Sequence, residues 1–333
     1  MIKVGIPRAL LYYQYYPMWQ TFFAELGVVV VVSPSTNQAM LAAGSSRVVA
    51  DTCLPAKVFI GHVLALADEC DLIFVPAVRS VKARIYNCSK FLGLPDMTRA
   101  VVPEAPPILD IDIDINRGKL NLYRALYRLG RRFSLNPFRV KRAAEAAWQA
   151  HLDYRRLMSR DGLTPSQVMA KMSATPAAEP EKLPGHPGGE PLTIAVIGHP
   201  YLLYDEHINH RLIHRLEQTG SRVLTPEMVD GGQLAAATLR LTGRPYWTYD
   251  DEVVGAGGYY LENGIDGVIG VMVFGCGPDS LMMDAVYRWS GRLKNTPFMS
   301  LTIDEHTAEV GILTRLEAFL DMIQQRKRRP VCV

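Results

Sequence analysis

The stretch KVGIPRALLYYQYYPMWQTFFAELGVVVVVSP, residues 3–34, predicts a strand, a helix and a second strand in succession. Residues 3–7 form a short apolar run that ends at Pro7, and residues 16–26 have the spacing of an amphipathic helix. Gly27 is a typical residue at a helix C-terminus. Residues 28–32 are all valine, and strands that are continuously apolar belong in parallel sheets covered on both faces. This stretch therefore predicts an α/β fold.

Strands and helices alternate in the same way in the rest of the first part of the chain and again in its last part. The middle of the chain has a different composition. We expect two doubly wound, Rossmann-like parallel-sheet domains, at residues 1–118 and 191–333. Residues 119–190 separate them as a helical insertion and a linker rich in Pro and Gly. The remaining predicted strands are 72–76, 192–197, 222–224, 267–274 and 298–303, and the remaining predicted helices are 37–43, 55–67, 205–218, 279–289 and 306–325.

Composition bounds the kind of protein. The 333 residues carry a net charge of only +3, so there is no case for nucleic acid binding. No apolar stretch approaches the roughly 20 residues of a membrane helix, and residues 1–6 open as a strand rather than as a secretory signal. We therefore expect a cytoplasmic protein without a membrane partner. The basic runs at 131–142 and 326–329 are solvated helix faces or docking sites for an acidic partner.

Three cysteines lie where we expect a strand to give way to a turn, at the ends of apolar runs and beside proline, glycine or small polar residues: Cys53, Cys88 and Cys276. Core cysteines usually lie inside apolar runs. Thiolates near free backbone N–H groups suit an iron–sulfur cluster, and three unrelated buried thiols are the alternative. No C-x-x-C pair exists, which excludes a zinc ribbon or a ferredoxin-type run. Cys70 ends a predicted helix and has a structural role, and we expect Cys332 to be frayed at the terminus.

Other polar residues follow predicted strands, where ligands of α/β sheets bind. His199, Glu305 and His306 are candidates for proton transfer, or they orient loops and cluster ligands. Arg8, Lys57 and Lys90 lie near the cysteines in sequence and could offset the negative charge of a cluster. The first two cysteines belong to one predicted domain and the third to the other, so we expect the site in the interdomain cleft.

A second arrangement concerns three histidines on the predicted helix 205–218. His207, His210 and His214 recur at i, i+3 and i+7, a face that could hold a metal ion. An exposed polar stripe opposite the apolar face explains them equally well. Nucleotide motifs are missing, because the chain has no G-x-x-x-x-G-K-[ST] and no complete G-x-G-x-x-G.

Several segments together resemble one known family, the acyl-CoA dehydratase activase-related group. That group is akin to the cluster-bearing subunits of 2-hydroxyacyl-CoA dehydratases, benzoyl-CoA reductases and double-cubane cluster proteins. The resemblance covers most of the chain except about 119–190. The segments that carry it include IPRAL (6–10), YPMWQTFF (16–23), CLPAKV (53–58), YNCSKF (86–91), GHPY (198–201), FGCGPD (274–279) and DEHTAE (304–309).

The resemblance implies a [4Fe–4S] cluster held by Cys53, Cys88 and Cys276, with one iron open to a non-protein ligand. It also implies a separate ATP-hydrolysing iron–sulfur activator that delivers low-potential electrons, under anaerobic conditions, for reductive chemistry on a small-molecule or acyl-CoA substrate. The dehydratases use two related subunits, whereas this protein is a single polypeptide with three candidate cysteine ligands. Two chains could bring six cysteines, so a homodimer with a larger or bridged cluster is a further expectation.

Three functions remain open at this point. The first is an ATP-activated iron–sulfur reductase or dehydratase (lyase)-like enzyme. The second is an electron-transfer or cluster-scaffold protein without its own substrate. The third is a structural zinc protein. An accessible fourth iron position favours the first, and a fourth protein ligand favours the second.

Overall fold

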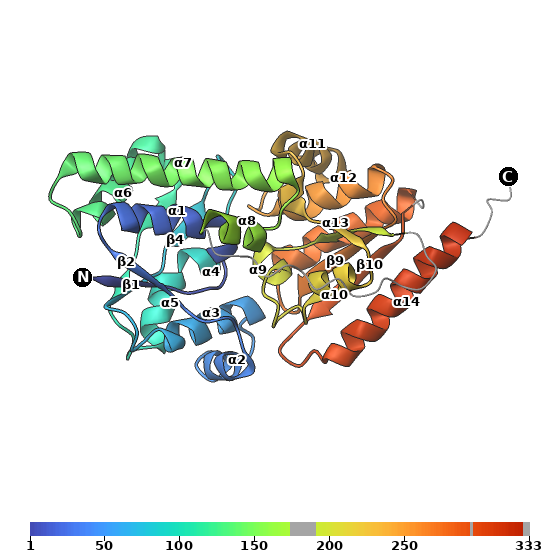
Figure 1. The fold of residues 1–333 in the computed structure, drawn as a ribbon, viewed down its shortest axis with the longest axis horizontal. Coiled ribbons are helices and arrows are strands. Elements are labelled where there is room, and N and C mark those ends of the chain that lie inside the picture. The colour runs from blue at the N-terminus through green and yellow to red at the C-terminus, as the bar shows by residue number, and fades with distance from the viewer. Residues whose placement is uncertain (174–190, 294–295, 329–333) are drawn as a thin grey trace. The chain divides into compact units, whose positions relative to one another are not determined.

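The structure, a computed structural model, describes residues 1–173, 191–293 and 296–328 (Figure 1). The chain divides into two compact units, one built from Met1–Thr175 with Pro245–Tyr249 and the other from the rest. Within the described residues, every pairing between named strands is parallel, and helices accompany each sheet. The predicted α/β class is confirmed. The helices between 119 and 172, which the sequence set apart, belong to the first unit.

The main sheet of the first unit has the order β2-β1-β3-β5. Its first strand thus lies between the second and the third. Residues 3–34 form the first two strands in register, with Val4 opposite Val30. The strand bounds are β1 (Lys3–Ile6), β2 (Val29–Val32), β3 (Leu72–Phe74) and β5 (Ile108–Leu109), and a separate two-stranded sheet joins β4 (Ala77–Ser80) to β6 (Asp112–Asp114).

Both faces of this sheet are covered. Successive residues of a strand point to opposite faces, so neighbouring residues of β1 show what packs on each side. Val4 and Ile6 of β1 pack with Phe22 and Phe23 of α1 (Tyr12–Glu25) in one core cluster. Between them, Gly5 faces the other side, where an added Cβ would lie 2.6 Å from the Sγ of Cys70. Helix α3 (Leu54–Ala65) leads toward that cysteine.

The remaining helices of the first unit lie around this core. Figure 1 shows α7 (Pro137–Asp161) running alongside α1, and the hydroxyl of Tyr154 donates to the carbonyl of Tyr13 at 2.7 Å. Val140 and Ala143 of α7 join the same core cluster as α1. The other helices are α2 (Gln38–Ser45), α4 (Ser89–Leu92), α5 (Leu94–Val101), η1 (Ile115–Arg117), α6 (Lys119–Arg131) and α8 (Pro165–Met172).

The second unit repeats the same strand order. Its sheet runs β10-β9-β7-β8, so here too the first strand lies between the second and the third. Continuous apolar sequence again makes buried parallel strands, most clearly in β9, which pairs on both edges. The bounds are β7 (Thr193–Ile197), β8 (Arg222–Leu224), β9 (Gly267–Val273) and β10 (Phe298–Ile303).

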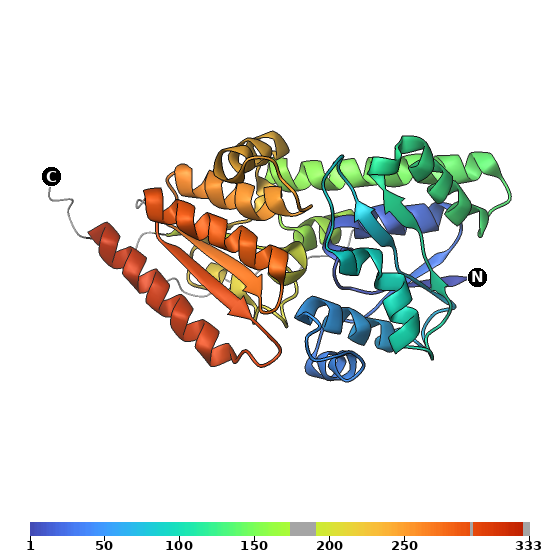
Figure 2. The ribbon, with the colours of Figure 1, turned by 180° about the vertical axis from the view of Figure 1, so that it is seen from behind.

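Two glycines of β9 show that helices cover both faces of this sheet (Figure 2). An added Cβ at Gly267 would meet Ile323 of α14 (Glu309–Arg328), and one at Gly270 would meet Met283 of α13 (Gly277–Leu293). Residues three apart in a strand face opposite sides. The other helical segments are α9 (Pro200–Leu203), α10 (Leu212–Gln218), η2 (Pro226–Met228), α11 (Gly231–Thr242), η3 (Asp251–Gly255) and α12 (Ala256–Glu262).

The predicted helix 205–218 is wrong over its first half, since α10 begins only at Leu212. His210 and Arg211 have φ angles of 53° and 59°, a left-handed backbone that cannot continue a helix. Asp205 accepts hydrogen bonds from the backbone N–H groups of His207 and Ile208 and so closes a turn instead. The three histidines therefore do not share one helix face.

Candidate functional site

Cys53 occupies the N-cap position of α3. Its carbonyl accepts from the N–H groups of Ala56 and Lys57, at 3.0 and 3.2 Å, which starts the helix. Within the described residues its thiol makes no capping hydrogen bond, and the side chain is half-buried. Contrary to expectation, no strand leads into Cys53, because the chain reaches it through the loop after α2. The setting still places the thiol at the positive end of a helix, where an anion is stabilised, but Pro55 has no N–H and the N–H groups of Ala56 and Lys57 already bond to the carbonyl of Cys53.

Cys88 is placed by the residue before it. Asn87 is buried, and its side-chain amide donates to the carbonyl of Val78 in β4 at 3.2 Å, while its backbone N–H donates to Arg79 at 2.8 Å. Cys88 itself is the N-cap of α4 and is half-buried. Residues 245–249 also hold the segment before Cys88. The backbone N–H of Tyr86 donates to the carbonyl of Tyr246, and the N–H of Thr248 donates to the carbonyl of Tyr86, at 3.0 Å each.

Cys276 lies in the turn between β9 and α13 of the second unit. The turn begins after Val273 and passes through Gly275, whose φ of 77° belongs to the left-handed region that favours glycine. The N–H of Cys276 donates to Val273 at 3.3 Å, and its carbonyl accepts from both the N–H and the hydroxyl of Ser280. Cys276 is half-buried, directly before a helix of 17 residues.

Two of the three predicted cations are anchored in the first unit. Lys57 lies one helical turn after Cys53, is only 3% exposed, and donates from Nζ to the carbonyl of Ala50 at 2.9 Å. Arg8 follows β1, donates to the hydroxyl of Ser35, and lies over the ring of Tyr12. A buried ammonium is costly unless an anion or acceptor compensates it. The third cation, Lys90, lies in α4, two residues after Cys88.

A buried histidine that was not among the candidate residues connects α3 to the segment after β2. His62 of α3 is fully buried, with Nδ1 2.8 Å from the hydroxyl of Ser33 and Nε2 2.9 Å from that of Thr36. The same Ser33 hydroxyl accepts from the backbone N–H of Arg8 at 2.8 Å. Burial, and then the nearby charge of Arg8, lower the pKa of His62 to about 4.

The proton-transfer candidates have different surroundings. His199 follows β7 and is 3% exposed, with Nδ1 3.3 Å from a carboxylate oxygen of the fully buried Asp279. Glu305 and His306 lie in the loop between β10 and α14, where Glu305 is half-buried and His306 is exposed. That loop is shaped by Asp304, whose carboxylate accepts from the hydroxyl of Thr307 and from the N–H of His306.

Sequence reasoning missed two acidic residues of the second unit. Asp279 lies three residues after Cys276, an acid at the start of a helix, which is a recognisable signal. Glu227 follows β8 and accepts a hydrogen bond from the hydroxyl of Tyr204. Burial raises the pKa of Glu227, and the neighbouring Glu252 raises it further. This carboxyl therefore keeps its proton to a higher pH than an exposed one.

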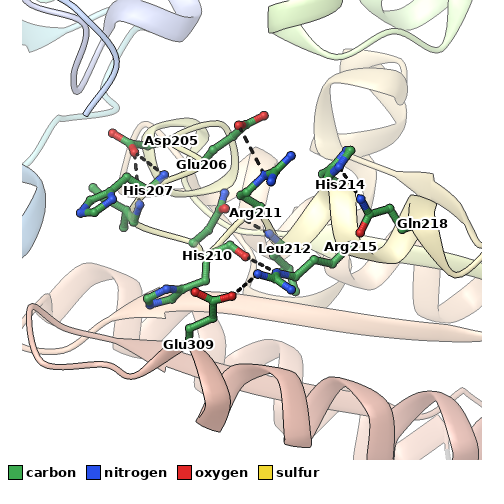
Figure 3. A network of polar contacts seen from close by, with 12 residues as sticks. Asp205, Glu206, His207, His210, Arg211, Leu212, His214, Arg215, Gln218 and Glu309 are labelled. Carbon is green, nitrogen blue, oxygen red and sulfur yellow. Dashed lines mark hydrogen bonds and ion pairs between the residues drawn. The ribbon is translucent and has the colours of Figure 1, made fainter. Parts of the chain in front are cut away.

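Figure 3 shows the histidine segment as the structure has it. His214 is the one that lies in α10, and its Nε2 is 2.6 Å from the amide nitrogen of Gln218. Arg215 donates to the carbonyl of His210 at 2.8 Å and pairs with Glu309 of α14. The polar groups here tie α10 to the turn before it and to α14.

Two further cysteines were not expected to be ligands, Cys70 because it is structural and Cys332 because it is frayed at the terminus. The Sγ of Cys70 donates to the carbonyl of Leu66 at 3.3 Å, and burial raises the pKa of this thiol. Cys332 lies outside the described residues. Across the parts of the chain that the structure describes, no group of three or more His, Cys, Asp or Glu side chains could hold a metal ion. No described helix is long and apolar enough to cross a membrane.

The comparisons with known proteins give one family. No curated protein matches the chain. A solved structure that matches is the C-terminus of E. coli RcsC with its linker region and phosphoreceiver domain, at 13% identity over 98% of this chain and 96% of that one. Its TM-score is 0.24, too low to carry an argument about the fold. A family model described as the CoA enzyme activase uncharacterised domain (DUF2229) matches residues 3–229, and the chain belongs to that family.

Proposed function

We propose that this protein is an iron–sulfur protein in which Cys53, Cys88 and Cys276 hold a [4Fe–4S] cluster that accepts low-potential electrons from a separate ATP-hydrolysing activator. The observation that carries the proposal is the common position of the three thiols. Each is half-buried and stands directly before the first residue of a helix, at Leu54, Ser89 and Gly277. Family membership supports the link to CoA enzyme activation.

The donor set suits the cluster. Backbone N–H groups at the starts of α3 and α13 stabilise anions, and thiolate ligands with bridging sulfides are anionic. Lys57 adds a buried positive charge one turn after Cys53. Arg8 and Lys90 are the further cations that we assign to the site. When bound, the cluster supplies one-electron reduction at low potential.

Cys53 and Cys88 belong to the first unit and Cys276 to the second. The shared strand order supports a pair of doubly wound, Rossmann-like units. Ligands of such sheets bind beyond the carboxyl ends of the strands. His199, Glu305 and His306 all follow strands of the second sheet and are the candidates for orienting groups or moving protons there.

The reaction that we propose is reductive chemistry on a small-molecule or acyl-CoA substrate, of the reductase or dehydratase type. A homodimer would bring six cysteines and could hold a larger or bridged cluster. The second candidate is an electron-transfer or scaffold protein with no substrate. A fourth protein ligand to the cluster, which would close the open iron position, would favour this second candidate.

Anaerobic purification followed by iron and sulfide analysis tests the proposal. We expect about four irons and four sulfides per chain and an oxygen-sensitive visible absorption. Stoichiometric zinc without iron in such a preparation would overturn it. Binding of a small molecule at the open iron, seen as a changed electron paramagnetic resonance spectrum on adding acyl-CoA thioesters, separates the enzyme from the carrier.

A further inference from the structure

A buried carboxylate, that of Asp279, forms a hydrogen bond at the start of the turn that carries Cys276. Asp279 is 0% exposed, and its Oδ2 accepts a hydrogen bond from the backbone N–H of Val273 at 2.8 Å. Val273 is the last residue of β9, and its carbonyl accepts from the N–H of Cys276 at 3.3 Å. Both backbone polar groups of Val273 are therefore committed to the cysteine turn, one of them through Asp279.

The other oxygen of the same carboxylate faces His199. Its Oδ1 lies 3.3 Å from Nδ1 of His199, which is itself 3% exposed and stacks on the ring of Tyr201 at 5.0 Å. A bare carboxylate at zero exposure is costly unless other groups compensate it. Here the backbone N–H of Val273 compensates Oδ2, whereas Oδ1 has Nδ1 of His199 beside it at 3.3 Å without a hydrogen bond between the two atoms.

The strand that presents His199 is pressed against β9 itself. Gly198 has a φ of 157°, and an added Cβ would lie 2.6 Å from the carbonyl oxygen of Val271. A larger residue could not approach so closely. This contact keeps the end of β7, and His199 with it, next to the end of β9 and the turn that follows.

An acidic residue in the first turn of a helix ordinarily stays at the surface near its own helix N–H groups. Asp279 instead reaches back to the preceding strand and braces the loop of Phe274, Gly275 and Cys276. That loop is otherwise exposed, with Phe274 70% accessible. The bond from Val273 to Asp279 thus acts on the same turn as the backbone bonds of Cys276 to Val273 and Ser280.

We propose that Asp279, held by His199, is a positioning residue for Cys276, and that His199 acts in this brace rather than at the substrate. The part of this inference that concerns a cluster rests on the proposed function. The part that concerns the thiol does not, because it can be measured in the chain without any metal.

The experiment follows alkylation of the metal-free full chain by iodoacetamide, with site-resolved mass spectrometry. The readout is the rate at Cys276 divided by the rate at Cys88 in the same molecule. We expect Asp279→Ala to raise this ratio about tenfold, the factor that follows from losing one buried hydrogen bond to a charged group. Asp279→Asn keeps an oxygen acceptor for Val273 and should restore most of the ratio.

A matched control lies on the same helix. Asp284 is exposed and pairs with Arg288 at 2.8 Å, so Asp284→Ala should leave the ratio unchanged. Cys70 reports general unfolding, because its thiol packs against Gly5. If Asp279→Ala does not fold, His199→Ala takes its place, since it removes the contact at Oδ1 that holds Asp279 while the bond from Val273 to Oδ2 can still form, and the ratio should still rise.

A folded Asp279→Ala or His199→Ala variant with the wild-type ratio overturns the inference. If the ratio rises equally in Asp279→Asn and Asp279→Ala, the result also counts against the inference, because a role of Asp279 in folding alone predicts no rescue by asparagine. After reconstitution, we expect an altered electron paramagnetic resonance spectrum in Asp279→Ala. If the wild-type chain binds no cluster, the proposed function fails while the alkylation ratio still decides the role of Asp279.

Discussion

The hydroxyl of Ser33 lies 2.8 Å from Nδ1 of His62, and this contact joins the end of β2 to the buried face of α3. Because the pKa of His62 is lowered to about 4 in the fold, against about 6.5 in an unfolded chain, unfolding takes up a proton between these values. The free energy of unfolding should therefore fall as the pH falls from 6.5 toward 4, by at most about 3 kcal/mol from this residue.

Urea unfolding of wild type and His62→Gln across that pH range checks this. The glutamine cannot titrate, so the pH dependence should flatten, although His151, with a pKa also lowered to about 4 by burial, keeps part of it. His306→Gln is the control, since that side chain is exposed. An unchanged pH dependence in His62→Gln would mean that the histidine is already charged in the folded protein.

The cysteine substitutions separate cluster ligands from structural thiols. Cys53→Ala, Cys88→Ala and Cys276→Ala should each lose or degrade the cluster, whereas Cys70→Ala and Cys332→Ala should keep full iron content. The physical reason is position, because the first three thiols stand at helix starts and Cys70 packs on β1. Iron analysis of anaerobic preparations measures the outcome. Full iron in Cys276→Ala would remove the second unit from the site.

Lys57→Met tests the buried positive charge beside Cys53. Removing a cation disfavours the reduced and more negative cluster, so the midpoint potential should become more negative by roughly 60 mV, a tenfold change in a one-electron equilibrium. Methionine fills a similar buried volume. Potentiometric titration gives the value, with Lys119→Met as a control for an exposed lysine of α6. A potential equal to that of wild type would show that Lys57 serves the loop at Ala50 alone.

Much of the fold could be predicted because its strands are continuous apolar runs. The strands at 222–224 and 298–303 have the predicted bounds, and Gly27 ends α1 with a φ of 79° as expected. The start of α10 could not be predicted, because neither His210 nor Arg211, which have the left-handed backbone, is a glycine, the residue that usually indicates such a backbone. The alternation of aspartate and isoleucine at 110–114 does indicate the strand β6, whereas its partner β4 has only four residues, two of them polar, and is not among the predicted strands.

Only those features of the candidate site that depend on residues adjacent in sequence could be predicted. Turn-forming neighbours pointed to Cys53, Cys88 and Cys276 without any knowledge of contacts. The bond from Val273 to Asp279 depends on a β9–α13 turn of one particular length, and the contact of His199 with the same acid joins residues 80 positions apart in sequence. Such long-range pairings have no signature in spacing.

Helices α2 and α3 pack backbone against backbone through two glycines. An added Cβ at Gly44 would lie 2.0 Å from the carbonyl oxygen of Lys57, and one at Gly61 would lie 2.1 Å from that of Met40. Gly44→Ala and Gly61→Ala must push α3 away and should destabilise the protein by about 1–3 kcal/mol or more. Thermal or urea unfolding measures this. Gly311→Ala in α14 meets no described atom within 4 Å and should be neutral or slightly stabilising.

The last prediction concerns the source of the electrons. The proposed source is a separate ATP-hydrolysing partner, and the chain itself has no G-x-x-x-x-G-K-[ST] motif. We expect mild donors to leave the cluster oxidised until an ATP-hydrolysing iron–sulfur activator and ATP are both present, since low-potential reduction needs that input of free energy. Absorption and electron paramagnetic resonance spectra under anaerobic conditions follow the reduction, and omitting ATP is the control. Equal reduction by a moderate-potential donor, with no change on adding activator and ATP, contradicts ATP-driven transfer and favours the plain electron carrier.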